Sequence, residues 1–308
     1  VEAPSDMLAT RGQIIDRNYN FRQFNNDLMV NAHKDFGKFN TMLLLGSNIY
    51  SSYNQTMQAT GKGTSIDGFE NISNASSITY YENHYLTRKV GFYAQANVEY
   101  DRFLNLSLTG RYDGSSVLAK NNSFYPYGSA ALAFVFSEFL GANARNWVDM
   151  AKLRASVATV GNDGVKPYSL LTPYESAANI GSIVFPFNGQ SGFLLSPMLG
   201  YPNLKNERLN EVELGFEGRF FKSRLSLEAS YFSKKTIDGI IPGVTTSAAS
   251  GYTSTTLNSA KLQNKGLEVL LNATPVRNSR FRWDVALNYS RIRNKVLAIN
   301  DEAAEPIL

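Results

Sequence analysis

Apolar and polar residues alternate along much of the chain with a period of two. Between residues 90 and 100, the even positions are apolar, and the odd positions include Gln95, Asn97 and Glu99. Successive side chains of a β-strand point to opposite faces. The alternation therefore predicts a strand with one apolar and one polar face.

The same pattern recurs from one end of the chain to the other. It predicts strands at residues 25–36, 38–53, 86–100, 104–112, 125–136, 153–157, 212–220, 225–231, 267–273 and 281–289. We expect about ten strands of roughly 10–16 residues, whereas strands of globular sheets usually have about 5–6. A tilted strand needs about 9–11 residues to cross a bilayer. No apolar run is long enough for a transmembrane helix.

The connections between these strands alternate in length. Short turns are predicted at 36–38, 101–103, 221–223 and 275–280, and long extracellular loops near 54–84, 162–206 and 233–262. Aromatic residues gather at both strand ends, such as Tyr100 and Phe103 beside a short turn and Tyr53 and Tyr112 toward long loops. Short turns on one side, long loops on the other and two aromatic bands are typical of an outer-membrane barrel. The predicted fold class is all-β, an antiparallel transmembrane β-barrel.

Composition excludes several other functions. The net charge is only +4, from 30 basic and 26 acidic residues that are interspersed, so no clustered basic face predicts nucleic-acid binding. The chain has no cysteine and two histidines, which removes disulfide scaffolds, iron–sulfur clusters and thiolate zinc sites. We expect no catalytic residues, no metal site and no cofactor.

Charged residues on the polar faces of the predicted strands are expected to line a hydrated lumen. They are Arg111, Arg154, Glu211, Glu213, Glu217 and Arg219. Paired carboxylates also serve glycoside hydrolysis, but acids two apart occur in any polar-lined strand. The lumen interpretation is therefore preferred over an enzymatic one.

The loop 162–206 carries aromatic residues without any periodicity. Those that we expect to contact a substrate or a partner are Tyr168, Tyr174, Phe187, Phe193 and Tyr201. The alternative is that they pack the loop on itself. At its start, residues 161–164 read Gly-Asn-Asp-Gly, a turn whose oxygens weakly favour calcium and more simply form a strand-to-loop turn.

Several segments together resemble a known family. They are Arg111-Tyr112-Asp113-Gly114-Ser115-Ser116, Ala151 to Ser156 running to Gly161-Asn162-Asp163-Gly164, Asn203-Leu204-Lys205, Tyr231 to Thr236, Asn264 to Glu268, and Asn294 to Leu297. This set resembles the SusC/RagA-type TonB-linked outer-membrane transporters of Bacteroidetes. The resemblance covers about residues 80 to 300.

The resemblance implies a multi-pass protein of the cell outer membrane. It implies a 22-stranded barrel with an N-terminal plug, of which this chain would be an internal or C-terminal segment without the plug or the TonB box. The implied function is import of oligosaccharides or peptides, with a SusD-like surface lipoprotein as lid. The implied partners are that lipoprotein, the TonB–ExbB–ExbD complex acting through the plug, and outer-membrane lipid.

Two other functions remain open on the sequence alone. A self-contained ten-stranded barrel could act as an outer-membrane hydrolase or a passive pore, although no convincing set of acids and histidine is visible. A soluble β-structure that binds glycans is the third alternative. In such a protein, the apolar faces of the strands would pack against each other between two facing sheets.

Overall fold

Ten long strands make up most of the computed structural model, which describes residues 12–177, 179–180 and 183–299. They are β1 (Gln13–Phe36), β2 (Phe39–Thr64), β3 (Ala75–Tyr100), β4 (Leu104–Ser115), β5 (Phe124–Phe134), β6 (Val148–Asn162), β12 (Glu207–Phe220), β13 (Leu225–Thr245), β14 (Ser254–Arg277) and β15 (Arg282–Ile299). The sheet is antiparallel along these strands, as the alternation predicted.

Five short strands and five single-turn helices lie in the connections. The strands are β7 (Tyr174–Ala177), β8 (Asn179–Ile180), β9 (Ile183–Val184), β10 (Gly192–Leu195) and β11 (Met198–Leu199). The helices are η1 (Ile72–Asn74), η2 (Lys120–Asn122), η3 (Phe136–Phe139), α1 (Ala142–Arg145) and η4 (Ala248–Ser250). None of the described helices could span a membrane.

The main sheet follows the order of the sequence. Its strands run β1-β2-β3-β4-β5-β6-β12-β13-β14, with β15 beside β14 and the short β11 paired to β14 in parallel. The contacts divide into two compact units, one of residues 1–26 and 49–89 and one of residues 27–48 and 90–308. The single barrel domain expected over residues 1–308 stays a prediction.

The first unit contains the connection between β2 and β3, which Asn74 organises. The Asn74 side chain is buried. Its Oδ1 accepts hydrogen bonds from the backbone N–H groups of Ser65 and Ile66 at 3.2 and 3.0 Å, and its Nδ2 donates to the carbonyl oxygens of Ile66 and Phe69 at 2.7 and 2.8 Å. One amide therefore satisfies four backbone groups, which fixes the conformation of the connection.

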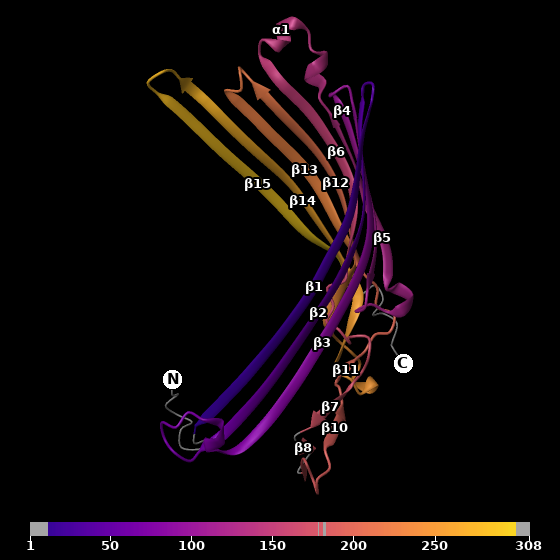
Figure 1. Cartoon of the computed structure of the whole chain (residues 1–308), viewed down its shortest axis with the longest axis vertical. Helices are drawn as coiled ribbons and strands as arrows, with labels where there is room; N and C mark the ends of the chain where they lie inside the picture. Colours follow the sequence, from indigo (N-terminus) through magenta and orange to yellow (C-terminus); the bar gives the residue numbers. More distant parts are fainter. Residues whose placement is uncertain (1–11, 178, 181–182, 300–308) are drawn as a thin grey trace. The chain divides into compact units, whose positions relative to one another are not determined.

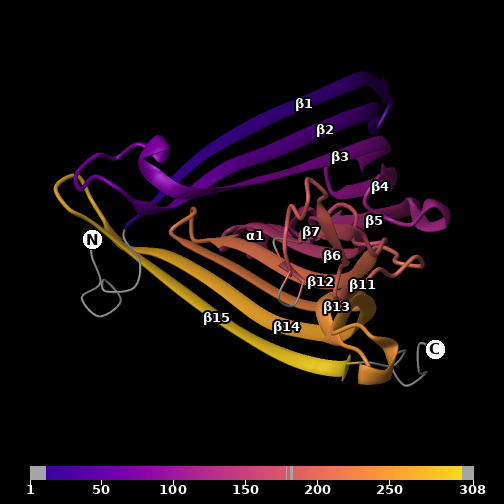
Figure 2. The ribbon, with the colours of Figure 1, turned by 90° about the horizontal axis from the view of Figure 1, so that it is seen from below.

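In the second unit, the strand registers place apolar residues of neighbouring strands in rows on one face. One row consists of Leu106, Leu132, Ala155, Leu214, Tyr231 and Leu267. Leu214 is 57% exposed and Val212 is 53% exposed, so no layer of described residues covers this face. Figure 2 shows the strands from β4 to β15 as one curved wall. A large uncovered apolar face is what contact with lipid requires.

The tight turns all lie at one end of the strands. Asp101, Arg102, Phe221, Lys222 and Ser223 have φ between 46° and 63°, the left-handed backbone of a sharp reversal. In the second unit, α1 lies at this same end, before β6, and the segment with β7 to β11 lies at the other, after β6 (Figure 1). Sharp reversals and the long connection after β6 thus lie at opposite ends, although residues 135–147 form a longer connection at the tight-turn end.

Two of the three long loops predicted from sequence are wrong in extent. Only residues 65–74 separate β2 from β3, and only residues 246–253 separate β13 from β14, whereas loops near 54–84 and 233–262 were expected. β2 has 26 residues, which is far more than a bilayer crossing needs. Where a strand extends beyond the part that contacts lipid, water contacts both of its faces. Apolar and polar residues then no longer need to alternate, although the strand continues. Residues 163–206 separate β6 from β12, close to the predicted long connection 162–206, and its extracellular placement stays a prediction.

A pair of neighbouring positions on β4 tests the assignment of the two faces. Leu106 is on the apolar face and Ser107 is on the polar face. We expect Leu106→Arg to destabilise the folded barrel by about 2–4 kcal/mol, because the guanidinium must enter hydrocarbon. Ser107→Arg should cost less than about 1 kcal/mol. Urea unfolding in lipid vesicles measures both, and equal losses would contradict the assignment.

Candidate functional site

Ion pairs cover the polar face of the second unit. Lys152 Nζ lies 2.6 Å from Glu217, and Arg154 Nη2 lies 2.7 Å from Glu228. Lys234 Nζ lies 3.1 Å from Glu211, on the next pair of strands. These side chains come from β6, β12 and β13, whose registers place them on the face opposite the apolar rows. The pairs stay partly exposed, as expected for charges beside water.

The registers bring the six charged residues predicted for the lumen to this one face. Arg111 pairs with Asp113 at 2.8 Å and stacks over the Tyr93 ring. Arg219 lies 3.7 Å from Glu217, and Glu213 faces Ser156 in the register. That they line a lumen stays a prediction. Glu211 and Glu217 each form an ion pair with a lysine. A general acid instead needs a carboxyl group that can reach the substrate and give it a proton.

At the long-loop end of the sheet, a small buried core forms around residues that follow β4. Val117, Leu118 and Tyr125 pack together, with Val165 against them. Gly161 permits this packing, since a Cβ there would lie 2.5 Å from the Tyr125 ring. Segments that look unrelated in the sequence, 115–125 and 161–165, therefore meet at one point.

Leu204 joins the returning end of the long connection to this region. Its side chain is 0% exposed. The N–H of Ala119 donates to the Leu204 carbonyl at 3.3 Å, and Asn122 Nδ2 donates to the Asn203 carbonyl at 3.1 Å. The connection is thus fixed to the 115–125 segment at its base.

Asn258 of β14 fixes the same base from the other side. Its Oδ1 accepts from the N–H of Lys205 at 3.0 Å, and its Nδ2 donates to the carbonyls of Lys205 and Asp238 at 2.7 and 2.9 Å. Thr255 Oγ1 donates to the Leu199 carbonyl at 2.9 Å. Asn258 and Thr255 are both buried, so these hydrogen bonds are shielded from water and costly to lose.

Asp238 adds ion pairs at the base of the connection. We call this group of contacts, made by Leu204, Asp238, Thr255 and Asn258, the anchor. Asp238 sits at a bulge in β13 with φ 55°, a conformation that Asp tolerates better than most residues. Lys205 Nζ lies 3.2 Å and Arg208 Nη2 2.8 Å from its carboxylate. Burial alone would raise the pKa of Asp238, but the hydrogen bonds from Arg208 and Lys205 outweigh it and hold this pKa below its ordinary value.

From this anchor, the connection extends as an arm, which we define as residues 166–199. Its strands β7 and β10 pair antiparallel, so that Tyr174 opposes Leu195 and Ser176 opposes Phe193. Tyr174, Phe193 and Leu195 therefore share one face of the ribbon. Gly192 lies on the other face against the Phe185 ring.

Most of the predicted loop aromatics are exposed on the arm. Tyr174 is 72%, Phe193 59%, Phe187 56% and Tyr168 50% exposed, so most of each of the first three rings lies outside the packing of the loop. Tyr201 differs, because it lies at the anchor, where its carbonyl accepts from the N–H of Leu204 at 3.3 Å. Contact with a substrate or a lid stays a prediction for all five.

Sequence reasoning missed the anchor residues Thr255, Asn258 and Asp238, because they fall where a loop was expected. Loss of alternation in residues 255–260 was the available signal, since these positions are buried on both faces. The described part of the chain holds no cluster of three or more His, Asp or Glu side chains suited to a metal. The weak calcium prediction at 161–164 remains untested.

Shortening Leu204 tests whether the buried contact holds the arm. We expect Leu204→Ala to cost about 2–5 kcal/mol locally, because the cavity cannot be refilled. The loss should appear as faster hydrogen exchange in residues 163–206 with the exchange of β5 and β12 unchanged. Leu194→Ala, at an exposed position of the arm, is the control. Uniform acceleration over the sheet would contradict a local anchor.

The Asp238 carboxylate should make the anchor sensitive to acid. Its pKa is lower in the folded than in the unfolded protein, so its contribution is complete above about pH 4 and is lost as the pH falls through the folded value. The difference in exchange protection of residues 199–208 between wild type and Asp238→Asn should therefore be large at pH 7 and shrink progressively as the pH is lowered below about 4. A difference that does not change with pH would refute this role.

Comparison with known proteins connects this geometry to a family. A family model described as "TonB dependent receptor-like, beta-barrel" matches residues 3–305. TonB-dependent receptor P3 of Formosa agariphila is 30% identical over 308 residues, covering 97% of this chain and 30% of the relative. TonB-dependent receptor SusC of Bacteroides thetaiotaomicron is 26% identical over 242 residues, covering 75% of this chain and 24% of the relative.

Among solved structures, the RagAB peptide importer in its closed-closed state superposes with a TM-score of 0.80 at 20% identity, covering 92% of this chain and 31% of that chain. This chain therefore spans about a third or less of the length of the relatives that it matches. The chain belongs to the TonB-dependent receptor β-barrel family, with a SusC-like sequence and an outer-membrane location.

Proposed function

We propose that this chain is the part of a TonB-dependent transporter that forms a wall of its conduit and presents an outer docking arm. The observation that carries the proposal is the arm, an exposed apolar ribbon held by a buried anchor at the long-loop end of the sheet. An exposed apolar surface whose base is already fixed serves binding, because less entropy is lost in ordering it.

The proposed cargo is a nutrient too large for passive diffusion, an oligosaccharide or a peptide. The relative RagAB is described as a peptide importer, which supports import as the process. The polar face offers alternating acids and bases, which keep water in the conduit and bind a neutral or zwitterionic chain weakly. Energy would come from TonB–ExbB–ExbD through a plug.

The proposed partner of the arm is a SusD-like surface lipoprotein that closes the conduit from outside. Tyr174, Phe193 and Leu195 share one exposed face, and aromatic residues dominate the energy of protein–protein contacts. A hydrolase or a passive pore is the alternative; against a hydrolase, Glu211, Glu217 and Glu228 of the polar face are each paired with a cation.

Substitutions on the two opposite faces of the β7–β10 ribbon test whether the lid docks on one of them. Tyr174→Ser with Phe193→Ser removes the shared aromatic face, and we expect at least a tenfold loss of lipoprotein co-purification and slow growth on the cognate nutrient. The matched control is Leu194→Ser, which lies on the opposite face and is 47% exposed. Barrel folding should stay normal in both, as measured by heat modifiability. Undiminished co-purification of the double variant would refute docking through this face.

A further inference from the structure

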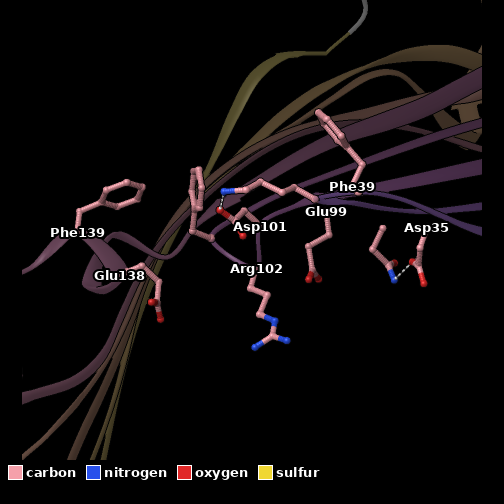
Figure 3. Close-up of a pocket in the computed structure, with 11 residues that line it drawn as sticks. Asp35, Phe39, Glu99, Asp101, Arg102, Glu138 and Phe139 are labelled. Carbon is pink, nitrogen blue, oxygen red and sulfur yellow. Dashed lines mark hydrogen bonds and ion pairs between the residues drawn. The ribbon is translucent and has the colours of Figure 1, made fainter.

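A pocket of 670 Å³ lies at the tight-turn end of the sheet, far in the sequence from the arm. It is lined by Asp35, Gly37, Lys38, Phe39, Asn40, Glu99, Asp101, Arg102, Phe103, Glu138 and Phe139. These residues come from the turn between β1 and β2, the turn between β3 and β4, and helix η3 (Figure 3). Its volume is in the range of small-molecule sites.

Aromatic rings form one side of this pocket. The Phe103 ring lies 4.8 Å from Phe139 and 5.4 Å from Tyr100, and the Phe39 ring lies 4.7 Å from Tyr100. Phe134 extends the cluster along β5. Phe134 and Leu104 are paired in the register and belong to the apolar face, so the cluster lies at the boundary of that face. Rings at such a boundary mark the height of the lipid headgroups.

The other side of the pocket carries charges of both signs. Lys38 donates to Asp101 at 2.6 Å, and the Asp101 N–H donates to the Lys38 carbonyl at 2.8 Å, so this pair joins the two turns. The side chain of Arg102, whose backbone has φ 63°, makes no ion pair or hydrogen bond to any described residue, and neither does the side chain of Glu99. Glu138 has only Arg145 within ion-pair range, at 3.8 Å.

Three charged side chains of this pocket point the same way. Figure 3 shows the side chains of Glu138, Arg102 and Glu99 extending from the backbone in one direction, away from the Phe39 and Phe139 rings. A ligand at this pocket thus meets a guanidinium flanked by carboxylates and an apolar surface behind them. Guanidinium groups bind phosphate oxygens in a fork geometry, and carboxylates accept hydrogen bonds from ammonium groups.

We propose that this pocket binds the headgroup of a phospholipid that carries a primary amine, of the phosphatidylethanolamine type. Arg102 binds its phosphate and Glu138 its ammonium at the rim of the sheet, and its acyl chains follow the ring cluster toward the apolar face. Asp35, Glu99 and Glu138 outnumber Arg102, so they repel a lipid with net negative charge. A quaternary ammonium has no N–H to donate to these carboxylates.

Retention of native lipid by the protein purified in mild detergent tests the proposal. Native mass spectrometry should find phosphatidylethanolamine bound in preference to phosphatidylglycerol. Arg102→Asn with Glu138→Gln should reduce this retention at least tenfold. The control is Lys222→Asn, a cation in another tight turn at the same end, with φ 57° and outside the pocket. It should retain lipid like the wild type.

A second measurement avoids dependence on the folding of a variant. Phosphatidylethanolamine added to the delipidated wild type should raise its unfolding temperature by several degrees, while phosphatidylglycerol and phosphatidylcholine should have clearly smaller effects. Equal effects of the three lipids, or retention that is the same in the double variant and the control, would overturn the proposal. Loss of lid docking would not affect either readout.

Discussion

The requirement that every backbone N–H and C=O be hydrogen-bonded within the bilayer determines this structure. Lipid offers no replacement partners, so strands can cross only as members of a sheet. The registers that satisfy the backbone also fix the side chains, because residues directly opposite on neighbouring strands share a face. Leu132, Ala155 and Leu214 thereby form one apolar row, and Ser156 and Glu213 fall on the other side. A slip of one residue would put charges into lipid.

Charges on the polar face follow from the same ladders. Lys152 and Glu217 lie directly opposite each other in the register of β6 and β12. The strand pairing by itself therefore brings the Lys152 ammonium within 2.6 Å of the Glu217 carboxylate. Pairs at exposed surfaces add little stability. Their value here is in keeping the polar face hydrated while the charges of Glu211, Glu217 and Glu228 are balanced by neighbouring cations.

The two ends of the strands are stabilised by different interactions. Tight turns with left-handed residues close the sheet at one end, and a lysine–aspartate pair joins two of them. At the other end, the chain leaves the sheet for more than forty residues and needs an anchor to stay ordered there. Buried amide hydrogen bonds from Asn258 and the fully buried Leu204 provide it, which is why the arm can expose apolar side chains without collapsing onto them.

The sequence by itself determined which residues face lipid, because lipid on one side and water on the other impose a period of two. It also determined the turns at 36–38 and 101–103, the long connection 162–206 and the shared face of Arg154 and Glu217. Strand extension beyond the apolar layer left no pattern, since water contacts both faces, and so β2 and β13 were read as too short. Only the tertiary structure decided the anchor. Asn258, Asp238 and Leu204 acquire their roles from contacts between segments distant in sequence, and such contacts follow from the registers rather than from any local spacing.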